Sequence, residues 1–209
     1  ASVVIVELSD MVDFNQLVEL VREIGPVDIL VNNAGFTTKG YYYQQDIIEQ
    51  ERMVLVHIVA MMKLTHTVLP GMIARRSGTI INVASIKAVT PLSLSATYCS
   101  VKAFMRNFSI SLHAEVKELG VKVQCVFPGF TRTDLGRGIG VDFNELDNSL
   151  AMHWMLPEEV VRVSLRDLHK RNKVICVPGA GNKALYMMAR VVPERWWSIM
   201  DSTIVKRMP

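Results

Sequence analysis

The sequence predicts an α/β fold built around a mainly parallel sheet. Short apolar runs of strand length alternate with longer segments in which apolar residues recur at helical spacing, and this alternation is typical of parallel strands covered by helices. Of the 209 residues, 50% are hydrophobic and 21% are charged, which excludes disorder and collagen-like repetition. A chain of this length forms one domain of about 150–250 residues or at most two small ones.

Strands are predicted wherever a short apolar run ends in residues that favour turns. The second run, for example, passes into Asn32-Asn33-Ala34-Gly35, and the last one stops at Pro178-Gly179. Five such runs cover residues 3–6, 27–31, 79–83, 121–127 and 174–177.

Helices are predicted in the segments between these runs. The first starts at Ser9 or Asp10 as the N-cap and stops at Gly25-Pro26, because Gly and Pro cannot continue a helix well. The others cover residues 46–73, with Pro70 expected to kink or close the helix, 98–119, ended by Gly120, and 157–169, opened by Pro157, and further helices are expected in the tail.

Charge and cysteine content restrict the partners and the compartment. A formal net charge of +3 is too small to favour nucleic acid, although residues 160–209 hold ten Lys or Arg against three Asp or Glu. Cys99, Cys125 and Cys176 are widely spaced, so the sequence offers neither a disulfide framework nor a CxxC metal site, and it favours a reducing, cytoplasmic setting. The longest candidate run, residues 54–62, contains His57, ends at Lys63 and is shorter than the roughly 18 residues of a membrane span.

Small and polar residues stand where three of the predicted strands end. Asn32-Asn33-Ala34-Gly35 follows the second strand, Ser85 the third, and Pro128-Gly129 the fourth. Ligands of open parallel sheets bind at the carboxyl ends of the strands, and small residues there let a backbone approach a flat ligand closely. Each motif taken alone is equally consistent with ordinary turn chemistry.

Tyr98 and Lys102 form a candidate acid/base pair. They are four residues apart in a predicted helix, so they share one helix face, and an ammonium group there favours the phenolate form of the tyrosine. A phenol with a pKa of about 10 needs such help to act as a general acid or base near neutrality. The pair alone is a weak signal, because a Tyr and a Lys one turn apart are common.

The order and spacing of these motifs together resemble the short-chain dehydrogenase/reductase family, including the thirteen residues that separate Ser85 from Tyr98. The resemblance implies a doubly wound, parallel-sheet Rossmann-like fold. Pro178-Gly179 and Asn182 are similar to the branch that contains DltE-type proteins.

The resemblance also implies hydride transfer between a nicotinamide dinucleotide, NADP or NAD with a slight preference for NADP, and a carbonyl or an alcohol. Tyr98 would pass a proton to or from the substrate oxygen, Ser85 would hold that oxygen, and Lys102 would bind the nicotinamide ribose and lower the tyrosine pKa. The other cofactor contacts that it implies are Glu7 and Leu8 at the adenine, Asn32, Ala34 and Gly35 on the adenosine side, and Pro128, Gly129 and Thr133 at the nicotinamide.

The chain departs from the family in two places. The family's first strand and its glycine-rich phosphate loop have no counterpart here, so the chain is expected to lack the first two strand-helix units of a longer enzyme and to be inactive by itself. The glycines of residues 136–140 do not replace that loop and are more typical of a hinge. His57 stands at the usual position of a catalytic asparagine, where it is either a packing residue or part of a proton relay with an altered pH dependence.

The substrate region and the tail leave alternatives open. Residues 130–156, which cover the substrate in relatives, favour a small apolar ketone or alcohol, or simply pack on their own domain; Tyr41 to Tyr43 form a second wall or a solvated loop. The tail, residues 183–209, contains Trp196 and Trp197 with basic neighbours, which is typical of packing on the domain or a subunit and less so of membrane contact.

Two function classes remain. The resemblance implies a homodimeric or homotetrameric oxidoreductase with Ser85, Tyr98, Lys102 and His57 in catalytic positions and no metal. The alternative is a non-catalytic binding or scaffold protein that retains the fold, which the substitution at His57 and the missing phosphate loop favour.

Overall fold

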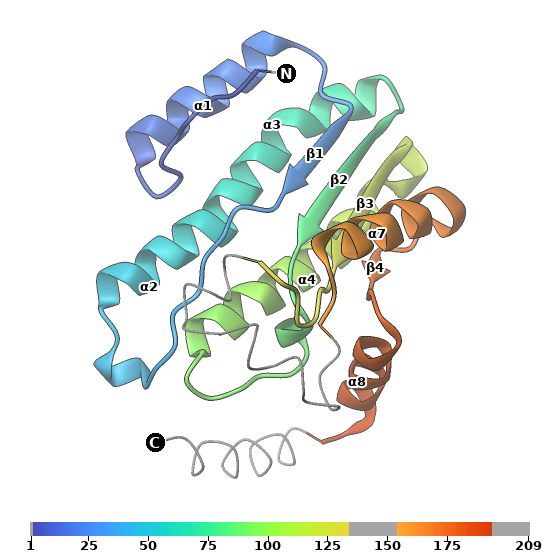
Figure 1. Ribbon diagram of the computed structural model, residues 1–209. Helices are drawn as coiled ribbons and strands as arrows, with labels where there is room; N and C mark the ends of the chain where they lie inside the picture. The colour runs from blue at the N-terminus through green and yellow to red at the C-terminus, as the bar shows by residue number, and fades with distance from the viewer. Residues whose placement is uncertain (1, 134–153, 194–209) are drawn as a thin grey trace.

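The computed structural model describes residues 2–133 and 154–193. Within them, four parallel strands form one sheet in the order β1-β2-β3-β4 (Figure 1). The strands are β1 (Ile29–Asn32), β2 (Gly78–Val83), β3 (Val121–Val126) and β4 (Ile175–Cys176). The last four predicted strands and the parallel α/β architecture are therefore confirmed.

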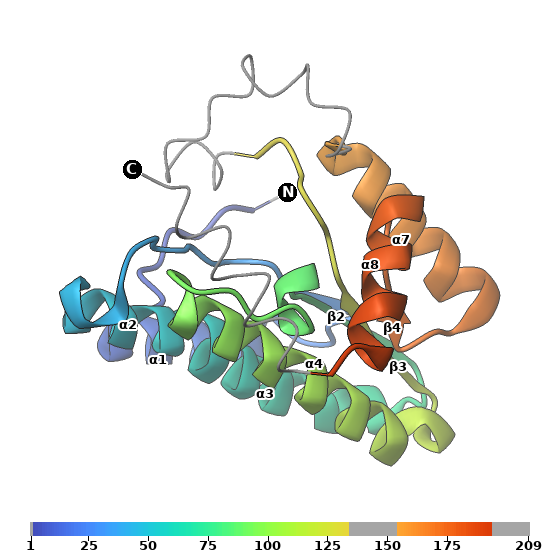
Figure 2. The ribbon, with the colours of Figure 1, turned by 90° about the horizontal axis from the view of Figure 1, so that it is seen from below.

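Helices cover both faces of this sheet (Figure 2). On one face lie α1 (Met11–Ile24), α2 (Ile47–Val54), α3 (Ala60–Ala74) and α4 (Ala96–Val116), and on the other lies α7 (Pro157–Arg171). The last helix, α8 (Ala180–Val191), packs through Leu185 and Tyr186 on the cluster that contains Met105 of α4 and Phe127. Short 3-10 turns occur at Tyr42–Gln44, Ile86–Ala88 and Lys117–Leu119. Because all four strands are parallel and are joined through helices, their carboxyl ends lie at the same edge of the sheet.

The predicted helix boundaries largely agree with the structure. The Asp10 side chain caps α1 by accepting from the backbone N–H of Val12 at 2.7 Å, and Gly120 ends the α4 segment with a left-handed φ of 83°. Pro70 lies inside α3, which continues to Ala74. The alternative in which Pro70 closes the helix is therefore wrong.

The prediction of a buried first strand at residues 3–6 is wrong. This segment has no regular secondary structure, and the side chains of Val3 and Ile5 are 86% and 95% exposed. An extended apolar segment becomes a strand only when a neighbouring strand satisfies its backbone groups, and the described residues supply none. The sheet consequently has four strands instead of five.

Two apolar cores hold the layers together. Beneath α3 and α4, Met72 and Leu112 pack on Ile80 and Val123 of the sheet. On the opposite face, α7 packs through Val160 and Leu168 on the sheet residues Ile81, Val126 and Cys176. Because β2 and β3 are covered on both faces, they form the rigid centre of the described structure.

The long central helix contains an irregularity at its middle. Helices α2 and α3 are joined without a break by a π-helical turn, Leu55–Val59, which has His57 at its centre. The whole segment Ile47–Ala74, which includes the apolar run of residues 54–62, is long and apolar enough to cross a membrane by length and composition alone. A core helix of an α/β sheet passes the same test, and this one packs against α1, α4 and β2.

Candidate active site

Ser85 lies directly after β2, where the chain enters a 3-10 turn. Its Oγ accepts a hydrogen bond from the Lys87 N–H at 3.2 Å. The backbone N–H of the next residue, Ile86, donates to the Pro128 carbonyl at 3.0 Å. Ser85 and the turn Pro128-Gly129 are therefore held side by side at the carboxyl ends of β2 and β3, as the sequence predicts.

Tyr98 and Lys102 lie one turn apart on α4 and face the same strand ends. The Lys102 side chain is 4% exposed, and its Nζ lies 5.6 Å from the centre of the Tyr98 ring. The same Nζ donates a hydrogen bond to the Val83 carbonyl, at the end of β2, at 2.9 Å. The Ser85 side chain lies close enough to the Tyr98 hydroxyl to lower its pKa. The predicted convergence of Ser85, Tyr98 and Lys102 is thus what the structure shows.

The electrostatics of this pair differ from the sequence expectation. Burial lowers the pKa of Lys102 to about 8, since a charged amine is disfavoured away from water. Burial also raises the pKa of Tyr98, and the Ser85 side chain opposes this shift without reversing it. The expectation that Lys102 lowers the tyrosine pKa is therefore wrong for the net effect, and Tyr98 is a neutral phenol near pH 7.

A small hollow lies next to Tyr98. It is lined by Gln50, by Leu94 to Thr97, and by Tyr42 and Gln45 of the tyrosine-rich loop. Tyr42 is also 55% exposed, so the loop borders this hollow and is partly solvated. Its role as a wall of the substrate region stays a prediction.

His57 reaches the same cluster from the π-helical turn. It is 2% exposed, and its ring centre lies 6.0 Å from that of Tyr98 in an edge-to-face arrangement. Nε2 lies 3.1 Å from the Phe36 backbone N, which donates to it, and 2.9 Å from the Phe36 carbonyl oxygen. Burial and the nearby charge of Lys102 lower the pKa of His57 to about 4, against the raising effect of the Phe36 backbone.

Asn32, at the end of β1, is part of a buried polar network. Its Nδ2 donates to Asn82 Oδ1 at 2.8 Å, and Asn82 Nδ2 donates in turn to Ser109 Oγ at 2.8 Å. Ser109 Oγ donates to the Met105 carbonyl on α4 at 2.7 Å. This chain ties β1 and β2 to α4 and occupies the Asn32 amide, while Ala34 and Gly35 beyond it are exposed.

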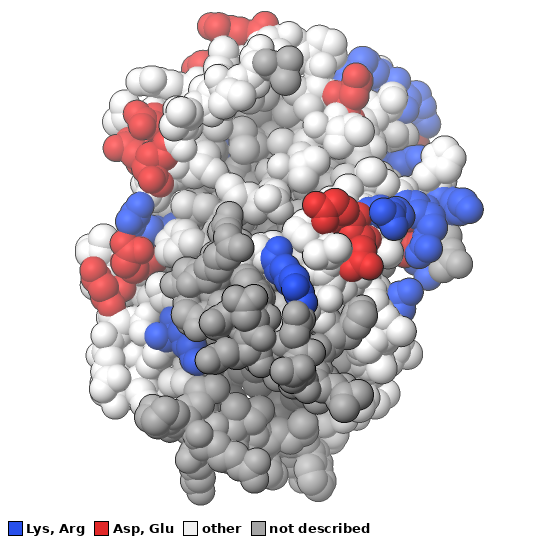
Figure 3. All heavy atoms as spheres, in the orientation of Figure 1, with Lys and Arg blue, Asp and Glu red and all other residues white. Residues whose placement is uncertain are grey.

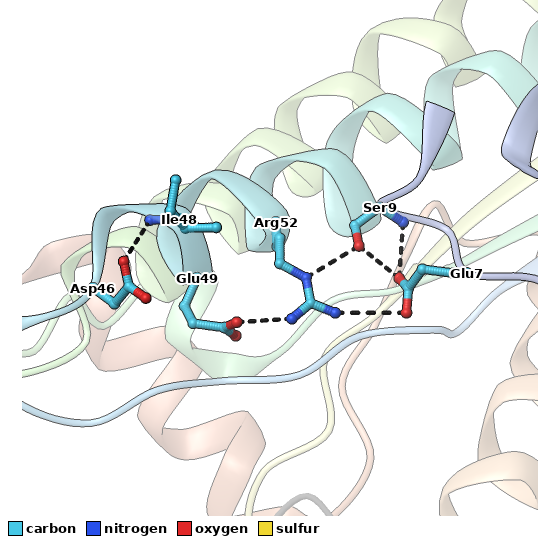
Figure 4. Close-up of polar contacts among 6 residues, drawn as sticks. All are labelled: Glu7, Ser9, Asp46, Ile48, Glu49 and Arg52. Atoms are coloured by element: carbon cyan, nitrogen blue, oxygen red, sulfur yellow. Dashed lines mark hydrogen bonds and ion pairs between the residues drawn. The ribbon is translucent and has the colours of Figure 1, made fainter. Parts of the chain in front are cut away.

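Glu7 and Leu8 lie outside the cluster of Ser85, Tyr98 and Lys102. The Glu7 carboxylate accepts hydrogen bonds from the Ser9 N–H and Oγ at 3.0 and 2.6 Å and lies 3.5 Å from Arg52 Nη2 (Figure 4). These hydrogen bonds from Ser9 lower the pKa of Glu7. Leu8 packs against the apolar cluster of Phe14. Glu7 is therefore held by Ser9 and by Arg52 of α2, and Leu8 by the apolar side chains of α1.

The predicted nicotinamide side is formed by the segment that follows β3. Pro128 and Gly129 are half-buried, and Thr133 is the last residue described before the gap. The far end of the predicted substrate region returns beside this segment: Met155 N–H donates to the Phe130 carbonyl at 3.0 Å, and the rings of Phe130 and Trp154 are 5.1 Å apart. Most of residues 130–156, and Trp196 and Trp197 of the tail, lie outside the described residues.

Two features of the site escaped the sequence analysis. Asn182, known from the sequence only as part of a motif, packs directly on Gly129. The π-helical turn at His57 carries no local sequence signal, since its residues Leu55–Val59 read as ordinary helix.

A parallel sheet with helices on both faces and a Ser-Tyr-Lys cluster at its strand ends define a Rossmann-like protein of the dehydrogenase class. The short chain dehydrogenase family model matches residues 1–142. The chain belongs to this family.

Known relatives agree in sequence and in fold. The chain is 28% identical over 205 residues to a dehydrogenase/reductase SDR family protein 7-like of Anopheles gambiae, which covers 96% of this chain and 64% of that protein. A short-chain dehydrogenase of Sphingobium yanoikuyae, solved in complex with NADPH, is 25% identical with a TM-score of 0.74, covering 97% of this chain and 74% of that one. A bulky-bulky ketone specific alcohol dehydrogenase of Comamonas testosteroni is 25% identical with a TM-score of 0.73, covering 100% and 74%.

The chain thus spans about two thirds of the length of the curated relatives that it matches. The finer resemblance to DltE-type proteins stays a prediction.

Proposed function

We propose that the full-length protein is an NAD(P)-dependent oxidoreductase that interconverts a carbonyl and an alcohol by hydride transfer. The convergence of Ser85, Tyr98 and the buried Lys102 at the strand ends carries this proposal. Membership of the short chain dehydrogenase family supports it. The NADPH complex of the Sphingobium relative supports NADP as the preferred cofactor, with NAD as the other candidate.

The described residues fit one part of such a cofactor. The Lys102 ammonium has three N–H donors and donates to one backbone oxygen, that of Val83, so it retains donors for a ribose hydroxyl. Gly35 and Gly129 bring the backbone of β1 and β3 to the same edge of the sheet. We propose Asn32, Ala34 and Gly35 for the adenosine side, Pro128, Gly129 and Thr133 for the nicotinamide, and Glu7 and Leu8 for the adenine. When bound, the nicotinamide ring supplies or accepts the hydride.

Within this proposal, the three catalytic side chains handle the proton. Ser85 donates a hydrogen bond to the carbonyl oxygen and orients it toward Tyr98. Tyr98, a neutral phenol because burial raises its pKa, donates its proton to that oxygen as negative charge develops. In the reverse direction the phenolate accepts the alcohol proton, and the positive charge of Lys102 stabilises it. The ring of His57 packs edge-to-face on that of Tyr98, so His57, the fourth residue at the catalytic positions, acts through this contact and not on the substrate oxygen itself.

We further propose a single domain in which residues 130–156 cover a small apolar substrate and residues 183–209 form a helical tail, of which α8 is the described beginning. The contact of Phe130 with Trp154 and the ketone named for the Comamonas relative support an apolar carbonyl compound. The proposal also includes two additional strand-helix units next to β1 and a homodimer or homotetramer that pairs through α4. The proposed setting is cytoplasmic, where the three buried cysteines stay unpaired.

A cofactor and substrate assay on the full-length protein tests this function. Binding of NADPH and NADH is measured by fluorescence titration, and oxidation of both is followed with a panel of aliphatic and aromatic ketones. The proposal expects cofactor binding and turnover of at least one ketone, which Tyr98→Phe abolishes. Binding without any turnover by the wild type would support the second candidate, a non-catalytic relative, which His57 at the asparagine position favours.

A further inference from the structure

Gly35 and Gly129 end the two strands that flank β2, and neither is required by backbone conformation. The glycines with positive φ in the described residues are Gly25, Gly40, Gly120 and Gly179, so Gly35 and Gly129 do not have the positive φ for which glycine is usually needed. A different constraint must therefore explain why these positions have no side chain.

Each of the two α-carbons is covered by a side chain from another part of the chain. A Cβ atom at Gly35 would lie 2.3 Å from Cε1 of His57, and one at Gly129 would lie 2.0 Å from Oδ1 of Asn182. Both distances are far below van der Waals contact. Alanine at either position would require the covering side chain to move away.

His57 is not free to move. Its ring is 2% exposed, Nε2 is paired with the Phe36 backbone, and the Tyr98 ring packs against it. Its Nδ1 has no hydrogen-bond partner among the described residues, and a buried polar atom without a partner destabilises a fold.

Asn182 is held in a similar way in the first turn of α8. Its Nδ2 donates to the Pro178 carbonyl at 2.8 Å and lies 3.8 Å from Met155 Sδ. The side chain thereby connects the turn after β4, the end of the predicted substrate region and the α-carbon of Gly129.

We propose that His57 and Asn182 are positioning residues. Their side chains pack on the α-carbons of Gly35 and Gly129 and hold the turns after β1 and β3 in the position that a bound dinucleotide requires. This inference rests on the proposed function, because it assumes that these turns face the cofactor. It assigns a role to Asn182 and a role to His57 that needs no change in its charge.

A double-substitution experiment on the full-length protein tests the contact with Asn182. The Kd for NADPH, kcat and KM for the ketone, and the melting temperature are measured for Gly129→Ala, Asn182→Ala and the combination. Residues in direct contact couple strongly, so we expect Gly129→Ala to weaken NADPH binding about tenfold and Asn182→Ala to restore most of that loss, since it removes all three atoms nearest to the added methyl group.

Gly181→Ala is the matched control. Gly181 precedes Asn182 in α8, lacks a positive φ, and has open space where its Cβ would lie. It should leave the Kd for NADPH unchanged and raise the melting temperature slightly, because alanine favours a helix.

The corresponding pair on the other side is Gly35→Ala with His57→Asn, since asparagine lacks the Cε1 and Nε2 atoms that a methyl group at Gly35 would meet. The same recovery of NADPH binding is expected there. A shift in KM for the cofactor with little change in the melting temperature distinguishes positioning from a purely structural role.

Four results would overturn the inference. If the wild type binds NADPH and Gly129→Ala binds it equally well, the exact position of the turn at Gly129 does not affect cofactor binding. If the losses of the two single variants simply add, the contact with Asn182 has no function. Should Gly129→Ala not fold, Asn182→Ala alone decides, because unchanged binding in that variant contradicts positioning. A wild type that binds neither NADPH nor NADH overturns the proposed function itself, and the positioning role with it.

Discussion

Strands β1 and β2 are hydrogen-bonded neighbours, yet their side chains lie in different surroundings. Val31 of β1 is in register with Ile81 of β2, but Val31 is 53% exposed whereas Ile81 is 6% exposed. Ile29 of β1 is also 55% exposed. Figure 3 shows mostly uncharged side chains over the upper middle of the molecule, with acidic and basic residues on both sides of them.

The difference separates the chemistry from the edge of the sheet. Ser85 follows β2, which is covered on both faces, and Tyr98 and Lys102 lie on the side of α4 that packs against the sheet, so their geometry is fixed within this chain. Strand β1 contributes a turn and its glycine, and it forms the edge of the sheet in the described residues. An apolar edge strand of this kind favours pairing with another strand.

The largest expected effect is a loss of turnover at the catalytic residues that follow β2 and lie on α4. Tyr98→Phe in the full-length protein should reduce kcat about 100-fold or more, because general acid catalysis contributes a factor of about 10² to 10⁴, while the Kd for NADPH stays close to that of the wild type. Steady-state kinetics and a binding titration check this. Tyr42→Phe, a phenol on the same hollow, should retain its activity. Near-normal turnover of Tyr98→Phe would remove the tyrosine from the mechanism.

A second prediction tests whether β1 is an edge in the complete protein. Val31→Asp is compared with Val161→Asp on α7, since the two valines are 53% and 54% exposed here. If further strands and helices cover β1, an aspartate at residue 31 becomes a buried charge and should lower the free energy of unfolding by about 2–4 kcal/mol. The aspartate at residue 161 stays on the surface and should change it by about 0.5 kcal/mol or less.

Urea unfolding of the three full-length proteins gives these values. Equal and small effects of the two substitutions would mean that the face of β1 is truly open, and the proposal of additional strand-helix units would fail.

The sequence predicts the covered side of the fold far better than the edge. Four of the five strands were located within a few residues, because β2 and β3 are apolar runs that are buried on both faces and need only local patterns to be found. Residues 3–6 have the same pattern but no neighbouring strand among the described residues. Their conformation depends on partners that a pattern does not reveal.

The site shows the same limit. Spacing placed Tyr98 and Lys102 on one helix face, and strand ends placed Ser85 beside Pro128, because both follow from local geometry. Depth of burial does not follow from spacing, which is why the net direction of the Tyr98 pKa shift was missed. The contact of Asn182 with Gly129 joins residues that are far apart in the chain, so only the folded structure could reveal it.

The third prediction concerns His57 and pH. Its pKa is lowered from 6.5 to about 4, so between these values the unfolded chain binds a proton that the folded one does not. The corresponding stability is present above pH 6.5 and is lost as the pH falls toward 4. His57→Asn should remove this loss, which is on the order of 1–3 kcal/mol.

Urea unfolding at pH 7, 6 and 5 measures the effect, and the activity profile of the same variants gives an independent test. An imidazole that stays neutral contributes no ionisation between pH 5 and 9, so wild type and His57→Asn should differ in rate but not in the shape of their profiles. An inflection near pH 6.5 that disappears in the variant would instead support the proton relay.

The smallest effect is expected for Glu7, on the edge side of the molecule. Its carboxylate is exposed and bound to Ser9 and Arg52, and exposed ion pairs contribute little to stability. Glu7→Gln keeps the shape and an acceptor oxygen for Ser9 but removes the charge, so the melting temperature should fall slightly at low salt. At 1 M salt, where the Debye length is about 3 Å, the difference from the wild type should vanish. The same variant tests the proposed adenine contact: if Glu7 serves Arg52 and Ser9 alone, the Kd for NADPH should stay unchanged, and a clear loss of NADPH binding would show that this carboxylate reaches the cofactor in the complete protein.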